Sequence, residues 1–132
     1  ESRSTTVVID ACFSGASGSG EMLIEQASPI GIRVNNPAAT LGEKAVVISA
    51  ASGSEIASWH TENRYGLLTY YFLKAVQGDA DLNQDQKITA EELRKYLTNP
   101  SDGLVYNARA LHGREQTPQV FGADDKVILE LD

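Results

Sequence analysis

The chain has 132 residues, enough for one small domain, and its hydrophobic content of 42% is ordinary for a globular protein. Its formal net charge of −7 argues against a nucleic-acid partner, and no apolar run approaches the length that spans a membrane. The lack of such a run predicts no membrane partner. A single cysteine excludes an internal disulfide framework and favours a reducing compartment, so we expect a cytoplasmic location.

The first predicted element is a strand over residues 5–11. Residues 5–9 are all β-branched, and a short apolar run of this kind is typical of a strand buried on both faces of a sheet. Asp10 ends the run, and the only cysteine, Cys12, follows two residues later. Open α/β sheets place their chemistry beyond the carboxyl ends of such strands, which makes Cys12 a candidate nucleophile. The alternative is a buried core cysteine, but the charged and small neighbours of Cys12 argue against it.

Residues 16–43 carry glycine, proline and asparagine breakers and predict a long loop, either a surface loop or a functional segment. Residues 44–52 predict a second buried strand that ends in small side chains, which would let a substrate backbone approach closely. Residues 67–77 place their apolar side chains at helical spacing and predict a core-facing helix, which Gly78 ends.

A second helix and a last strand complete the predicted order. Thr89 and Glu92 have the spacing of a capping box, which predicts a short helix that ends before Asn99. Residues 100–118 predict irregular structure, and residues 127–131 predict a third strand. The order of strands and helices predicts an α/β fold.

Residues 81–92 resemble the calcium-binding loop of an EF-hand. The oxygen ligands at its positions one, three, five, seven and twelve would come from Asp81, Asn83, Asp85, the backbone carbonyl of Lys87, and Glu92. The departure is Gln86, because the sharp turn at position six normally requires a glycine with positive φ. The sequence leaves two interpretations open, weak calcium binding and a metal-free relic of the loop.

Residues 10–15, Asp-Ala-Cys-Phe-Ser-Gly, resemble the Asp-x-Cys-x-Ser-Gly nucleophile motif of metacaspases and bacterial caspase-like peptidases. Residues 52–59, 66–73 and 116–119 resemble successive blocks of the same domains, in the same order. The resemblance implies a cysteine endopeptidase that acts on protein or peptide substrates and needs no cofactor for its chemistry. It also implies a three-layer caspase-like sandwich, of which residues 1–132 hold the C-terminal half of the mostly parallel sheet with its helices.

The resemblance implies roles for individual residues. Cys12 would be the nucleophile, and Asp10, Ser52 and Glu55 would bind a substrate with Arg or Lys before the scissile bond. A carboxylate selects a cationic side chain through a charge-assisted hydrogen bond. From the residues alone, Asp10 also fits a strand-end carboxylate that caps nearby amides. The resemblance further places a processing linker at residues 16–43, where Arg33 would be the first self-cleavage site to test.

The catalytic histidine of this family precedes the cysteine, whereas His60 and His112 both follow Cys12. We therefore expect the base and the N-terminal half of the peptidase domain to lie on sequence upstream of Glu1. The partial domain would then have an uncovered sheet edge and be inactive alone. Two other classes stay open: a non-catalytic caspase-like interaction or calcium-sensing module, and an unrelated flavodoxin-like domain with a chance motif.

Overall fold

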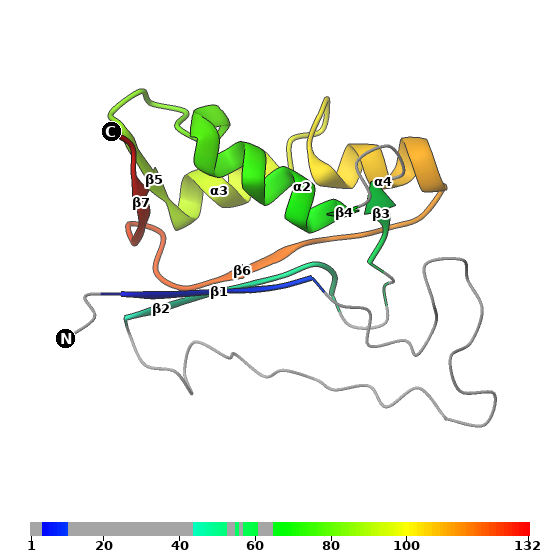
Figure 1. Cartoon of the computed structure of the whole chain (residues 1–132). Helices are drawn as coiled ribbons and strands as arrows, with labels where there is room; N and C mark the ends of the chain where they lie inside the picture. Colours follow the sequence, from blue (N-terminus) through cyan, green and yellow to red (C-terminus); the bar gives the residue numbers. More distant parts are fainter. Residues whose placement is uncertain (1–3, 11–43, 53–54, 56, 61–64) are drawn as a thin grey trace.

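The computed structural model describes residues 4–10, 44–52, 55, 57–60 and 65–132. This part of the chain is of the α/β class, with strands and helices that follow one another along the sequence (Figure 1). In chain order they are β1 Thr5–Ile9, β2 Ala45–Ser49, β3 Trp59–His60, β4 Tyr65–Gly66, α2 Leu67–Lys74, a π-helical turn Ala75–Asp79, β5 Lys87–Thr89, α3 Ala90–Leu97, α4 Leu104–His112, β6 Gln119–Phe121 and β7 Val127–Glu130.

The main sheet has the strand order β1-β2-β6. β1 runs parallel to β2, with Thr5 opposite Ala45, and β6 pairs antiparallel with the other edge of β2. The prediction of a strand buried on both faces is correct for β2, where residues 45 to 48 are all buried. It is wrong for β1, where Val8 is 36% exposed, because β1 has only one hydrogen-bonded neighbour within the described residues.

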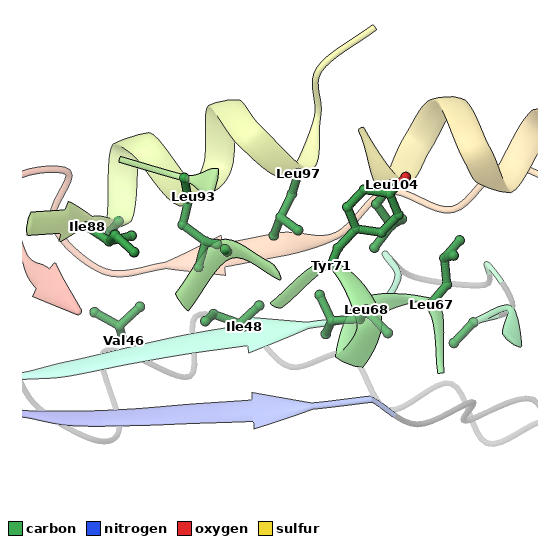
Figure 2. Close-up of a cluster of buried hydrophobic side chains, with 14 of the residues drawn as sticks. Val46, Ile48, Leu67, Leu68, Tyr71, Ile88, Leu93, Leu97 and Leu104 are labelled. Atoms are coloured by element: carbon green, nitrogen blue, oxygen red, sulfur yellow. The ribbon is translucent and has the colours of Figure 1, made fainter. Parts of the chain in front are cut away.

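Helices α2, α3 and α4 lie on one face of this sheet (Figure 1). Val46 and Ile48 of β2 point toward that helical layer and meet leucines from it (Figure 2). The fully buried side chains at the centre of this core are Ile48, Leu67, Leu68, Ile88, Leu93, Leu97 and Leu104. Apolar burial of this extent is what holds the helices on the sheet.

The two predicted helices are present. α2 begins at Leu67 and continues as the wider turn at residues 75–79, where Gly78 has a φ of 117° that ends the helix. α3 begins at the predicted capping box: the Glu92 amide donates to Thr89 Oγ1 at 3.3 Å, and the Thr89 amide donates to Glu92 Oε2 at 3.0 Å.

Several elements differ from the sequence predictions, among them α4 and β7. Residues 100–118, predicted to be irregular, contain α4, whose buried side Leu104 and Ala108 is too short to give a strong periodic signal. Residues 127–131, predicted as the third strand, form β7, which pairs with β5 and not with the main sheet. Within the described residues, no helix has both the length and the apolar character needed to cross a lipid bilayer.

Two leucines of α4 give a matched test of this packing. Leu104 is fully buried and Leu111 is 53% exposed on the same helix. We expect Leu104→Ala to lower the free energy of unfolding by about 2–5 kcal/mol, because it leaves a cavity in the core. Leu111→Ala should change it by less than about 0.5 kcal/mol. Urea unfolding followed by circular dichroism measures both values, and equal losses would contradict the described packing of α4.

Candidate functional site

Asp10 lies at the carboxyl end of β1 and reaches across to α2. Its Oδ2 accepts a hydrogen bond from the Thr69 amide at 2.9 Å and another from Thr69 Oγ1 at 2.6 Å. Gly66, the residue that precedes α2, contributes no side-chain cap. Asp10 therefore supplies, from another strand, an acceptor for one of the amides that a helix leaves unpaired in its first turn.

Gly66 is required by this contact. A Cβ atom at position 66 would overlap the carboxylate of Asp10. The backbone of Gly66 is in an ordinary extended conformation, so the glycine serves close approach and not a positive φ. The capping role that the sequence left open for Asp10 is thus present, and its predicted role toward a substrate stays a prediction.

Cys12 lies outside the described residues, as do residues 16–43 with Arg33, so the predicted nucleophile and linker stay predictions. The two histidines sit on separate elements. The ring of His60 on β3 lies 4.1 Å from that of Tyr70 on α2. His112 ends α4, and its buried Nε2 has no hydrogen-bond partner.

Glu55 joins two segments beyond the carboxyl end of β2. Its Oε2 accepts hydrogen bonds from the Ser52 amide at 3.1 Å and the Thr117 amide at 2.6 Å, and its Oε1 accepts one from Thr117 Oγ1 at 3.0 Å. Burial raises the pKa of the Glu55 carboxyl, but these hydrogen bonds outweigh it, and the pKa lies below the ordinary value of 4.5. The structure thus brings Ser52 and Glu55 together and occupies both oxygens of Glu55 with donors of the chain itself.

Gln116 is a buried polar residue of the same region to which sequence reasoning gave no role. It is fully buried, its Oε1 accepts from the Ser58 amide at 2.8 Å, and its Nε2 donates to the Ala50 carbonyl at 3.0 Å. The hydroxyl of Ser58 is buried and has no hydrogen-bond partner. The sequence signal that could have identified Gln116 is its place in the stretch 116–119, which resembles a block of caspase-like domains.

The loop at residues 81–92 is held by hydrogen bonds between its own side chains and backbone amides. Asp81 accepts hydrogen bonds from the amides of Asp85 at 3.2 Å and Gln86 at 3.0 Å, and the Lys87 amide donates to Asp85 Oδ1 at 2.9 Å. Asn83 Oδ1 accepts from the Asp85 amide at 3.0 Å. Gln86 takes the positive φ of 66° that the turn demands, although it is not a glycine.

The far end of this loop is tied to the core. Glu92 is 8% exposed, its Oε2 belongs to the capping box of α3, and its Oε1 accepts weakly from the Asn83 amide at 3.4 Å. β5, which carries Lys87 to Thr89, pairs antiparallel with β7. In the part of the chain that the structure describes, no three His, Cys, Asp or Glu side chains converge closely enough to hold a metal ion.

Comparisons of the chain with protein-family models, curated proteins and solved structures found no match. The two candidate sites are therefore judged from the chemistry of their residues alone. The first is the carboxyl end of the parallel pair β1–β2, with Asp10, Ser52 and Glu55. The second is the loop at residues 81–92, with Asp81, Asn83, Asp85, the Lys87 carbonyl and Glu92.

The hydrogen bonds of Glu55 predict a stability effect that depends on pH. Glu55→Gln puts an amide NH₂ against the donors of Ser52 or Thr117, so we expect the free energy of unfolding at pH 7 to fall by about 1–3 kcal/mol. Because the pKa of Glu55 is depressed in the folded state, this contribution is complete above pH 4.5 and is lost as the pH falls through the folded-state pKa.

Urea unfolding of the wild-type chain and Glu55→Gln between pH 3 and pH 7 measures the difference. The control is Glu130→Gln, which removes an exposed carboxylate 3.8 Å from Lys87 and should cost less than about 1 kcal/mol. A wild-type advantage over Glu55→Gln that stays constant from pH 7 to pH 3 would contradict the assignment.

Proposed function

We propose that this chain is part of a cysteine-type endopeptidase of the caspase and metacaspase type. The observation that carries the proposal is the position of the cysteine motif relative to the sheet. The motif at residues 10–15 begins at the carboxyl end of β1, a strand parallel to β2, and parallel sheets hold their reactive groups at that edge. Ser52 and Glu55 follow β2 at the same edge.

In this proposal the sheet and its helical layer are the C-terminal half of a three-layer caspase-like sandwich. The upstream half supplies the histidine base. The Cys12 thiolate attacks the scissile carbonyl, the amine leaves with a proton from the histidinium, and water then hydrolyses the thioester to release the acid and the thiol. The backbone N–H of Cys12 is the first oxyanion donor. Asp10 recognises Arg or Lys before the scissile bond through a charge-assisted hydrogen bond.

The test uses the full-length protein and three fluorogenic peptides that differ only in the residue before the scissile bond: Arg, Gln or Asp. We expect cleavage of the Arg peptide, little cleavage of the Asp peptide, and loss of activity in Cys12→Ala, because no other thiol is present in this chain. The melting temperature of Cys12→Ala serves as the folding control. Activity that survives in Cys12→Ala, or a preference for Asp, would overturn the proposal.

A second function, weak calcium binding by residues 81–92, is favoured by one specific observation. Gln86 adopts a positive φ, which is the conformation that position six of an EF-hand loop normally takes with a glycine. The oxygen donors suit calcium, which takes six to eight oxygen ligands in flexible geometry. Since the carboxylates do not converge, calcium must draw them together, and we expect affinity at the weak end of the range, about 10⁻⁴–10⁻³ M.

Calcium at ten times its Kd should stabilise the chain by about 1.4 kcal/mol. We therefore expect the melting temperature to rise by several degrees with calcium against chelator. Asp81→Ala should abolish that rise, and Asp132→Ala, which removes an exposed carboxylate outside the loop, should retain it. Gln86→Gly should increase the affinity for calcium, because glycine adopts positive φ without a steric cost. A melting temperature that calcium leaves unchanged in the wild-type chain, in Asp132→Ala and in Gln86→Gly would identify the loop as a relic.

A further inference from the structure

We propose that Thr69 is a positioning residue of the peptidase site, which fixes the Asp10 carboxylate so that Oδ1 meets the cationic side chain of the substrate. The inference rests on the proposed function above and assigns a role to a residue of α2 that has no part in the nucleophile motif. It starts from the two hydrogen bonds that join Thr69 to Asp10 across 59 positions of the sequence.

Both of these hydrogen bonds end on the same oxygen. The amide of Thr69 and its hydroxyl converge on Asp10 Oδ2, at 2.9 Å and 2.6 Å. Within the described residues, no hydrogen bond or ion pair ends on Oδ1. A carboxylate held at one oxygen by two donors from different directions cannot rotate freely about its Cβ–Cγ bond, so its plane is set by Thr69.

Gly66 lies against the same carboxylate. A Cβ atom at position 66 would overlap Oδ2 and would also stand too close to Oδ1, so the half-buried carboxylate packs against the residue that precedes α2. The two oxygens of Asp10 differ in their hydrogen bonds. Oδ2 accepts both bonds from Thr69 and anchors the side chain, and Oδ1 is the oxygen that we assign to the substrate.

This separation matters for a basic substrate. A guanidinium or ammonium group gains most from a carboxylate that is already oriented, because no side-chain entropy is then lost on binding. Without the hydroxyl of Thr69, the Asp10 carboxylate keeps only the amide donor and can turn about that single bond. Substrate binding through the cation should then weaken, while the reaction at Cys12 should not change.

The experiment uses the full-length protein with Arg and Gln peptides that are otherwise identical. Thr69→Val removes the hydroxyl but keeps the β-branched shape and the backbone amide. We expect kcat/KM for the Arg peptide to fall about fivefold through KM, with kcat nearly unchanged and the Gln peptide unaffected. Thr69→Ser, which restores the donor, should return the Arg peptide to within about twofold of wild type.

A purely structural role would lower kcat for both peptides, and that result would overturn the proposal. A wild-type protein that cleaves the Arg peptide, with Thr69→Val equal to it, would overturn the proposal and leave the peptidase function intact. A wild-type protein that cleaves neither peptide would overturn the peptidase function itself. Binding of the Arg peptide to Cys12→Ala, measured by fluorescence anisotropy, gives a second readout without turnover, where Thr69→Val should weaken Kd by the same factor.

Discussion

The buried amide of Gln116 holds together the carboxyl end of the sheet. A strand that ends inside a protein leaves backbone donors and acceptors without partners, and each unpaired buried group costs about 1–3 kcal/mol. Gln116 forms one hydrogen bond with each of two segments. Its Nε2 donates to the Ala50 carbonyl after β2, and its Oε1 accepts from the Ser58 amide before β3. Because its side chain is fully buried, water does not compete for either hydrogen bond.

Asp10 and Glu55 likewise accept hydrogen bonds from backbone amides that would otherwise lack partners. Asp10 caps α2 from β1, and Glu55 joins the amides of Ser52 and Thr117. Each of the three side chains accepts from a backbone group that is distant in sequence. The edge of the sheet where we propose the chemistry is therefore built from polar side chains, whereas the helical layer above it rests on leucines. Such an edge keeps a fixed shape, because satisfied polar networks are rigid.

The sequence predicted the elements with strong local signals. The β-branched run before Asp10, the apolar stripe of residues 67–77 and the capping box at Thr89 each encode their structure within a few neighbours. The elements it missed depend on distant contacts. β6 is a strand because it pairs with β2, and α4 is a helix whose short buried side packs on α2. The partial exposure of β1 follows from its place at the edge of the described sheet, which no local pattern reveals.

The residues of the candidate site also divide into those that the sequence predicts and those that it does not. Cys12, Asp10 and the ligand set of residues 81–92 could be selected from motif and spacing. The partner of Asp10 on α2, the clamp of Glu55 on Thr117 and the role of Gln116 could not, because each joins residues about 60 positions apart. The positive φ of Gln86 was also hidden, since its residue type disfavours the conformation that the surrounding hydrogen bonds impose.

The pairing of β5 with β7 joins residues that are synthesised at different times. Residues 87–89 leave the ribosome about 40 residues before their strand partner at 127–130. During synthesis the loop at 81–92 therefore exists for some seconds with the edge of β5 open, since translation proceeds at about 5–20 residues per second. Over that interval the capping box of α3 and the hydrogen bonds within the loop are the contacts that can hold its end. β7 thus completes a pairing whose other strand was synthesised earlier.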